Sequence, residues 1–306
     1  MRLIERLHKF RFEWAIRAIG GTPPVQLQSG ELTVLSMVQH RDVLPYLLAV
    51  KSFTRFVPTA AVVVVADPTL DESDRAVMRQ HVPDIVFQEA VAFRRPGIPQ
   101  GGCWERLSAI AEHSSKSYVV QLDADTLAVA PMMEVARAIA DGRSFTLGTE
   151  DGQEIGSTSE QAAWARGQLQ GEVHIQGLCE AALDRLDPGN QFRYVRGCAG
   201  FAGFARNSIS PALVLDVSQR MQALIGERWS GWGTEQFTSN LLVATSAGAR
   251  VLPHPNYCAP HRRNSATVFY HFIGYVRYAS GLYARLANQV MQELRSARVQ
   301  DTGHER

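Results

Sequence analysis

The stretch SYVVQLDADTLAVAP, Ser117 to Pro131, places two carboxylates directly after an apolar run. Residues 118–122 predict a buried strand, and Asp123 and Asp125 follow at its end. Neighbouring carboxylates repel each other unless a cation or solvent compensates their charge. A divalent metal is one such cation, because Mg²⁺ and Mn²⁺ take oxygen ligands. A solvated turn is the other interpretation of an isolated Asp-x-Asp, since aspartate is favoured in turns.

Strands and helices alternate through the first half of the chain. Strands are predicted over 32–38, 61–66, 84–88 and 118–122, with helices over 44–56, 71–81 and 103–113 between them. This alternation predicts an α/β fold with a mostly parallel central sheet flanked by helices. Open sheets of this kind bind ligands beyond the carboxyl ends of their strands, which is where Asp123 and Asp125 are expected. The C-terminal part is less regular.

Composition excludes several classes of protein. The chain has 306 residues, 45% apolar and 20% charged, with a net charge of +1, so no strong field attracts nucleic acid. The four cysteines are far apart in sequence and suggest neither a zinc site nor a disulfide framework. No apolar run approaches the roughly 20 residues that span a bilayer, and a cytoplasmic protein is expected.

The N-terminal segment 1–30 is expected to form an amphipathic helix and a linker. A single domain over 31–280 should follow, and then a C-terminal helix and tail over 281–306. Leu3, Leu7, Phe10 and Trp14 share one face at helical spacing. Five cationic residues against two glutamates give residues 1–20 a charge of +3. One interpretation is peripheral contact with the inner face of the membrane. The other is a helix that docks on the domain or mediates oligomerisation.

Two further chemistries place an Asp-x-Asp after a strand. An aspartate-nucleophile phosphatase carries D-x-D-x-T/V after its first strand, whereas three strands precede this motif and Leu127 stands at the Thr/Val position. A sugar nucleotidyltransferase would carry a glycine-rich phosphate loop after the first strand, but residues 37–46 contain no glycine. A motif about 90 residues after the first strand instead suits nucleotide-sugar chemistry.

Four separated segments together resemble glycosyltransferases of the GT-A fold, and are most like glycosyltransferase family 8. In order, they are WERLSAIAEHSSKSYVVQLDADTLAV (104–129), GCAGFAGFAR (197–206), WGTEQFTSNLL (232–242) and HFIGYVRY (271–278). The likeness covers roughly residues 32–278. The chain departs from the family pattern at Glu235 (Asp in the family), Arg277 (Lys), Tyr278 (Pro) and Ala199, near where Asn is expected.

The resemblance implies a Rossmann-like GT-A domain that moves a sugar from a nucleotide-diphospho-sugar, expected to be UDP-linked. The acceptor could be a glycan, a lipid-linked sugar or a small molecule. The implied metal ligands are Asp123, Asp125 and His271, with Mn²⁺ favoured over Mg²⁺ because imidazole suits Mn²⁺ better. A strand-end histidine with a satisfied hydrogen bond is the other interpretation of His271. A non-catalytic nucleotide-sugar-binding protein of the same fold is the alternative function.

Roles for the remaining residues follow from position or from the resemblance. Arg106 and Arg277 would contact the donor and its phosphates, Gly274 would let backbone amides approach the diphosphate, and Gly200 and Gly203 would open space for the sugar ring. The residues expected to bind the nucleotide-sugar are Val38, His40, Arg106, Asp123, Ala124, Asp125, Gly200, Gly203, Gly274 and Arg277.

Two neighbouring residues compete for the catalytic role. In a retaining enzyme the resemblance places Gln236 on the reacting face, where its amide oxygen would steady positive charge at the anomeric carbon. In an inverting enzyme Glu235 would be the general base that deprotonates the acceptor hydroxyl. The spacing E-Q-x-x-x-N favours retention. Trp229 and Trp232 are candidates for an acceptor platform, or for core packing.

Overall fold

The computed structural model describes residues 3–171, 173–274 and 276–301. Met1, Arg2 and the end of the expected tail from residue 302 lie outside this range. The strands are β1 Leu32–Val38, β2 Ala61–Ala66, β3 Val86–Glu89, β4 Tyr118–Leu122, β5 Thr126–Ala128, β6 Phe145–Gly148, β7 Gly156–Ser157, β8 Arg193–Tyr194, β9 Gly197–Phe204, β10 Arg250–Leu252, β11 Tyr257–Cys258 and β12 Phe269–His271. The α-helices are α1 Leu3–Ile16, α2 Val43–Thr54, α3 Glu72–His81, α4 Trp104–His113, α5 Met133–Ala140, α6 Thr158–Gln168, α7 Ile175–Glu180, α8 Leu183–Leu186, α9 Pro211–Ile225, α10 Thr234–Thr245 and α11 Leu282–Asp301.

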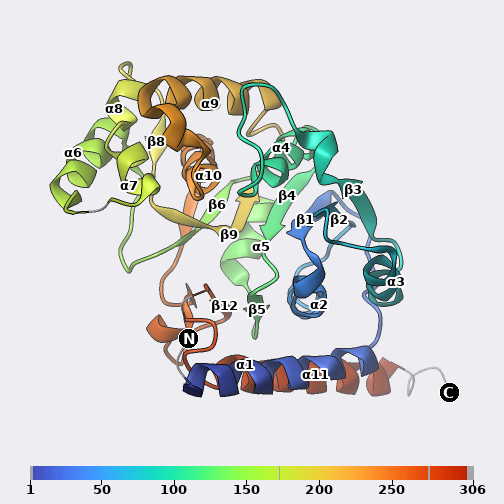
Figure 1. Ribbon diagram of the computed structural model, residues 1–306. Coiled ribbons are helices and arrows are strands. Elements are labelled where there is room, and N and C mark those ends of the chain that lie inside the picture. The colour runs from blue at the N-terminus through green and yellow to red at the C-terminus, as the bar shows by residue number, and fades with distance from the viewer. Residues whose placement is uncertain (1–2, 172, 275, 302–306) are drawn as a thin grey trace.

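A seven-stranded sheet forms the centre of the molecule (Figure 1). Its strands lie in the order β10-β6-β9-β4-β1-β2-β3, and β9 runs antiparallel to both of its neighbours. The other neighbouring pairs are parallel. The predicted α/β class, with a mostly parallel central sheet flanked by helices, is therefore confirmed.

Alternate side chains of the central strands enter two separate cores. Val34 of β1 packs with α2, α1 and α11 on one face of the sheet, whereas the next residue, Leu35, packs with α4, α9 and α10 on the other. Val119 and Val120 of β4 divide in the same way. Because successive side chains of a strand point to opposite faces, a strand buried on both faces has a continuous apolar sequence such as AVVVVA.

Helices α1 and α11, from the two ends of the sequence, lie alongside each other beneath the domain (Figure 1). Phe12 stacks on Tyr283 with 3.9 Å between ring centroids, and Arg295 donates to the carbonyl oxygen of Ala18. The N-terminal helix thus docks on the domain through one of its faces. Among the residues that the structure describes, no helix combines the length and the apolar character needed to cross a bilayer.

A three-stranded sheet, β11-β12-β5, supports the region beyond the end of β4. Strand β5 pairs antiparallel with β12, with Thr126 opposite His271. The amide of Phe272 donates to the carbonyl oxygen of Asp125 at 2.8 Å, and Asp123 N donates to Gly200 O at 2.9 Å. These backbone bonds fix the Asp-x-Asp turn between β9 and β12.

Candidate metal and nucleotide-sugar site

Asp123, Asp125 and His271 converge at the carboxyl end of β4. Asp123 directly follows β4, Asp125 directly precedes β5, and His271 ends β12. Each of the three offers one ligand atom, and these atoms lie within 4.8 Å of one another. The β5–β12 pairing therefore places His271 beside two carboxylates that precede it by about 150 residues in sequence.

The imidazole of His271 is held from both of its nitrogens. Nε2 lies 3.1 Å from Oδ1 of Asp125, and Nδ1 lies 3.2 Å from Sγ of Cys198. A Cβ at Gly200 would come within 2.1 Å of the His271 ring, so a glycine is needed there to admit the imidazole. This corrects the expected role of Gly200, because the space it leaves is filled by a side chain rather than open to a sugar ring.

Gly203 lies in the core rather than at the site. A Cβ at this position would meet the Phe145 ring at 2.3 Å and the Tyr118 hydroxyl at 2.5 Å. The expectation that Gly203 opens space for a sugar is corrected in the same way, since side chains of β6 and β4 occupy that space.

Arg106 of α4 joins two acidic groups within the protein. Nη1 donates to Oδ1 of Asp123, and Nη2 lies 3.2 and 3.3 Å from the two carboxylate oxygens of Glu235. The side chains of Arg106 and Glu235 are only 5% and 4% exposed. The burial of this ion pair places Arg106 inside the protein and not on its surface.

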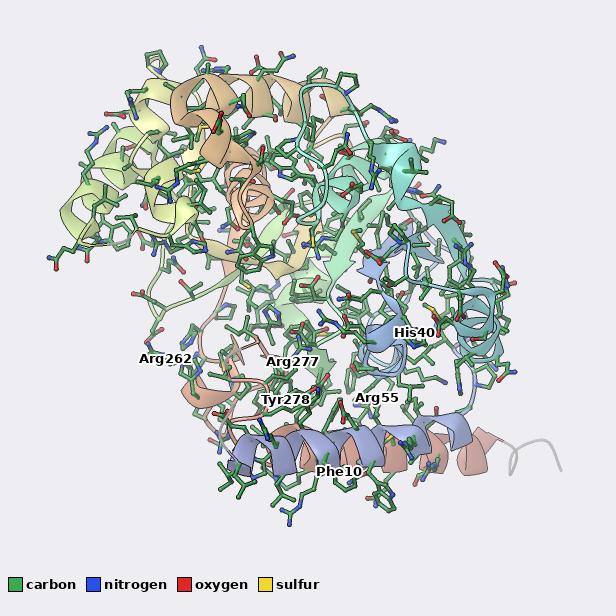
Figure 2. All side chains as sticks on the ribbon, in the orientation of Figure 1. Phe10, His40, Arg55, Arg262, Arg277 and Tyr278 are labelled. Carbon is green, nitrogen blue, oxygen red and sulfur yellow. The ribbon has the colours of Figure 1, made fainter. Side chains whose placement is uncertain are left out.

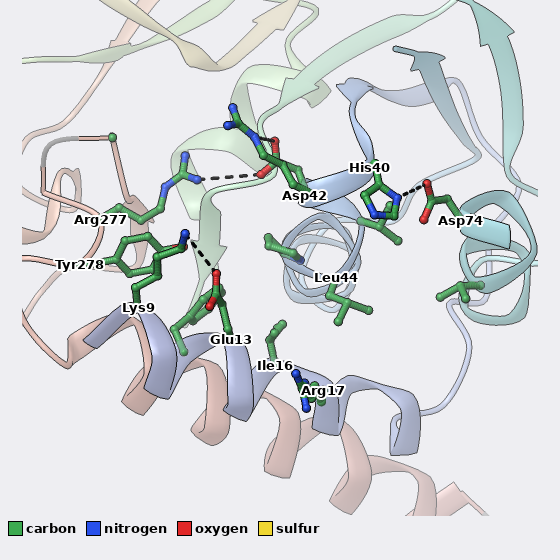
Figure 3. Close-up of a pocket in the computed structure, with 16 residues that line it drawn as sticks. Lys9, Glu13, Ile16, Arg17, His40, Asp42, Leu44, Asp74, Arg277 and Tyr278 are labelled. Atoms are coloured by element: carbon green, nitrogen blue, oxygen red, sulfur yellow. Dashed lines mark hydrogen bonds and ion pairs between the residues drawn. The ribbon is translucent and has the colours of Figure 1, made fainter. Parts of the chain in front are cut away.

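Arg277 connects the carboxylate pair to a cleft. Its Nη2 donates to Oδ2 of Asp125, its Nε donates to the carbonyl oxygen of Phe272 at 3.1 Å, and its Nη1 lies 4.0 Å from Asp42. The cleft has a volume of about 720 Å³ and lies between α1 and the segment after β1 (Figure 3). A guanidinium group at this edge can bind phosphate oxygens through two donors at once.

Burial and neighbouring positive charges shift the pKa values of the carboxyl groups in opposite directions. Burial alone would raise the pKa of Asp125, but His271 and Arg277 outweigh it and lower that pKa to about 2. Burial raises the pKa of Asp123, against the attraction of Arg106. Burial also raises the pKa of Glu235 to about 7, although Arg106 opposes the shift. Asp125 is consequently the most strongly ionised of the three.

Glu235 and Gln236 open α10 but differ in access. Both carboxylate oxygens of Glu235 face Arg106 inside the protein. Gln236 is half-buried, its Oε1 accepts from the amide of Ala199 at 3.4 Å, and its Nε2 donates to Gln176 at 3.1 Å. Gln236 is therefore the more accessible of the two, with its amide oriented by both partners.

The remaining residues expected to bind the nucleotide-sugar separate into buried and exposed positions. Val38 is 1% exposed and its carbonyl oxygen accepts from Asp67 N, so its side chain does not reach the cleft. His40 lines the cleft and bonds Asp74 through Nδ1 at 2.8 Å. Gly274 lies exposed on the cleft, with open space where a Cβ would be. Ala124 is half-buried between the two aspartates.

The two tryptophans that were candidates for an acceptor platform differ in their exposure to solvent. Trp229 is fully buried and its Nε1 donates to Ser218 at 3.0 Å, so it is a core residue. Trp232 is 74% exposed and packs edge-on against the ring of His174, with centroids 6.1 Å apart. Only Trp232 keeps the geometry of a sugar platform.

Three residues in this region were not identified from the sequence. Asp42 lines the cleft and faces Arg277, and its position soon after β1 was a signal that could have found it. Cys198 contacts His271, and it lies in the segment 197–206 that is part of the resemblance. Gln176 holds Gln236, and nothing in its local sequence marks it.

The chemistry of the donor set fits a divalent cation. Two carboxylates and one imidazole suit Mn²⁺, or Mg²⁺ less well, and their ligand atoms are close enough to share one ion. Asp125 already bonds His271 and Arg277, so a cation would share or replace those contacts. Asp123 is the more open carboxylate, with 28% of its side chain exposed against 10% for Asp125.

No family model matches the chain, and no curated protein matches its sequence. It is similar to the solved structure of mouse xyloside xylosyltransferase 1, with 12% identity, a TM-score of 0.45, and 79% of this chain and 96% of that chain covered. It is also similar to galactosyltransferase LgtC with donor and acceptor sugar analogues, with 12% identity and a TM-score of 0.44. That match covers 84% of this chain and 95% of LgtC. A third similar structure is WbbM, a bifunctional glycosyltransferase, with 14% identity and a TM-score of 0.48. That match covers 86% of this chain but only 45% of WbbM, so this chain spans less than half of that protein. The resemblance to family 8 stays a prediction.

Proposed function

We propose that this protein is a metal-dependent glycosyltransferase that moves a sugar from a nucleotide-diphospho-sugar, with UDP as the favoured nucleotide. The observation that carries the proposal is the convergence of Asp123, Asp125 and His271 at the end of β4, with ligand atoms within 4.8 Å. This cluster lies where open α/β sheets bind their ligands. Arg277 extends from it to the rim of a cleft of about 720 Å³.

Asp123, Asp125 and His271 would hold the cation, which when bound supplies Lewis-acid stabilisation of the departing diphosphate. Arg277 would bind phosphate oxygens from the rim of the cleft, since its guanidinium is half-buried between Asp125 and Asp42. Arg106 fixes Asp123 from the opposite side. The charges on both aspartates are thereby oriented before any ligand arrives, which is the general requirement for electrostatic catalysis.

Retention of configuration is the favoured stereochemical course. Glu235 is 3% exposed and both of its oxygens face Arg106, so it is poorly placed to take a proton from an acceptor. Gln236 is more open, with its amide oxygen held near β9 by Ala199 N. We infer that Gln236 faces the sugar and that Glu235 positions Arg106.

The acceptor stays open among a glycan, a lipid-linked sugar and a small molecule. Trp232, just before α10, and His174, directly before α7, form an exposed aromatic pair, and α10 is the helix that carries Gln236. Aromatic faces commonly stack on sugar rings, so this pair is the proposed acceptor contact. The cytoplasmic location expected from the sequence also stays a prediction.

Titration of UDP with and without Mn²⁺ tests the site. We expect Mn²⁺ to tighten UDP binding by at least tenfold, and Asp125→Ala to remove that gain. Asp216→Asn, an exposed carboxylate of α9 paired with Arg220, is the matched control and should bind as the wild type does. Equal binding without metal, or an unchanged Asp125→Ala variant, would refute the metal site.

Incubation with a panel of UDP-sugars then separates an enzyme from a binding protein. A glycosyltransferase should slowly hydrolyse one donor in the absence of acceptor, and Gln236→Ala should slow that reaction more than it weakens UDP binding. Metal-dependent binding with no hydrolysis of any donor would favour the non-catalytic alternative. Release of phosphate from simple monoesters would favour the phosphatase.

A further inference from the structure

Helix α1 has two apolar faces, and only one of them contacts the protein. Phe12, Ala15 and Ile16 are at most 4% exposed and pack against the domain. Four residues on the opposite side form a continuous stripe, which we call the outer stripe: Leu3, Leu7, Phe10 and Trp14. They are 84%, 46%, 65% and 69% exposed, and Ile4 beside them is 58% exposed. Five of the ten large apolar side chains that are most exposed in the described chain therefore belong to this one helix.

Arginines border the outer stripe on both sides. At about 100° per residue, Arg6 and Arg17 fall along one edge and Arg11 along the other. All three are exposed. Lys9 pairs with Glu13 further round the helix at 3.4 Å, on the side that lines the cleft. The surface that faces away from the domain thus combines an apolar centre with cationic borders.

We propose that the outer stripe of α1 docks this protein on an anionic lipid surface, with α1 lying in the plane of the headgroups. Leucine and aromatic side chains would enter the boundary between headgroups and acyl chains, and the arginines would contact lipid phosphates. Tryptophan and arginine both suit this boundary, since each has an apolar part and a polar end. The inference does not depend on the proposed sugar transfer.

A lipid surface fits this stripe better than a second copy of the chain does. At about 200 Å² for a large apolar side chain, the exposed fractions of the five residues sum to roughly 600 Å², below the roughly 800 Å² per partner of a stable interface. Arginines on both borders would also face arginines across a symmetric contact. Lipid phosphates instead complement them.

The position of α1 links this surface to the site. Figure 2 shows Phe10 on the lower rim of the molecule and Arg277 further inside the domain. Lys9 and Glu13 of α1, and Arg17 directly after it, line the cleft (Figure 3). A helix with its side chains is about 10 Å across, so docking would hold the rim of the cleft close to the headgroups.

Co-sedimentation of the full chain with vesicles tests the proposal. We expect the wild type to bind vesicles of phosphatidylcholine with phosphatidylglycerol at least tenfold more tightly than vesicles of phosphatidylcholine alone. Phe10→Ser with Trp14→Ser should weaken binding to the anionic vesicles at least tenfold. Arg11→Glu should weaken that binding severalfold and reduce its dependence on salt.

Two matched controls exclude general effects of the changes. Trp164→Ser removes another exposed tryptophan, 47% exposed on α6, and Arg185→Glu makes the same charge change on α8, away from α1 (Figure 1). Both should bind vesicles like the wild type, and all variants should keep the wild-type circular dichroism spectrum. Absence of vesicle binding by the folded wild type overturns the proposal, as does unchanged binding of the Phe10/Trp14 variant. A wild-type dimer that this double variant converts to a monomer, without any vesicle binding, would assign the stripe to self-association.

Discussion

Among the residues that the structure describes, two places gather one histidine and two aspartates with ligand atoms within 4.8 Å. One is Asp123, Asp125 and His271 beyond β4, and the other is His40, Asp71 and Asp74 at the start of α3. The side-chain types are identical. Asp125 and His271 are buried, whereas His40 and Asp71 are exposed. Residue type and proximity therefore do not distinguish a functional site from a structural one.

The acidic groups of the second cluster have a structural task. Asp71 accepts from Asp74 N at 2.9 Å, and Asp74 accepts from Asp71 N at 3.2 Å, which is the reciprocal capping box of a helix N-terminus. Their charge is favoured there by the helix dipole. In the first cluster, Arg106 and Arg277 balance the carboxylates from separate elements. Oxygens that are not committed to a helix cap are the better candidates for a ligand.

The largest expected effect follows from removing Arg106. Arg106→Met leaves Asp123 and Glu235 without their buried cation, which should lower the free energy of unfolding by about 3–5 kcal/mol. Arg79→Met, beside the second cluster, removes a half-exposed arginine 3.8 Å from Glu72 and should cost less than about 1 kcal/mol. Urea denaturation measures both. Equal losses would contradict the distinction between a buried and a solvated cluster.

A pH-dependent effect of up to about 3 kcal/mol is expected from Glu235. Burial raises its pKa from the ordinary 4.5 to about 7, and each pKa unit corresponds to about 1.36 kcal/mol. A raised carboxyl pKa means that the folded state binds the proton more tightly than the unfolded state does. The resulting contribution of Glu235 to the free energy of unfolding is fully present below pH 4.5 and is lost as pH rises to about 7. Glu235→Gln should therefore gain stability relative to the wild type between pH 5 and pH 8. Parallel stability curves for the two proteins would show that Glu235 does not carry the shift.

A substitution at Gly200 tests the placement of His271. Gly200→Ala would push a methyl group against the imidazole, which should cost about 1–3 kcal/mol of stability and weaken Mn²⁺ binding at least tenfold. Gly167→Ala in α6 is the control, because open space surrounds that position and alanine favours a helix by up to about 1 kcal/mol. Calorimetry with Mn²⁺ gives the affinities. Unchanged affinity in a destabilised Gly200→Ala would remove His271 from the ligand set.

Local patterns were sufficient to predict the central strands and the helices between them. Four apolar runs became β1, β2, β3 and β4 within a few residues of the predicted bounds. Of these, β1, β2 and β4 are buried on both faces and need continuous apolar sequence, whereas β3 is a short strand at the edge of the sheet. The C-terminal part, expected to be less regular, contains short elements such as α7, α8 and β12. β6 and β10 were missed, since each is only three or four residues long and owes its structure to pairing.

The site depended on contacts that no local pattern contains. Asp123 and Asp125 could be identified because both lie at the end of one strand. The placement of His271 beside them follows from the β5–β12 register, and here the resemblance supplied what periodicity could not. The burial of Trp229, and the filling of the space at Gly203 by Phe145, follow from packing between elements far apart in sequence. Such packing decides whether a residue lies in the core or at the site.

The smallest expected effect concerns the second cluster and tests it as a helix cap. Asp71→Ala should lower the free energy of unfolding by about 1 kcal/mol, because one capping bond is lost at an exposed helix end. Ser157→Ala removes the equivalent cap of α6, which accepts from Glu160 N at 3.2 Å, and should cost a similar amount. Urea denaturation gives the stabilities, and calorimetry gives Mn²⁺ and UDP binding, which Asp71→Ala should leave unchanged. Loss of Mn²⁺ binding in this variant would instead assign the metal to the capping cluster, because a helix cap alone has no reason to affect a cation bound beyond β4.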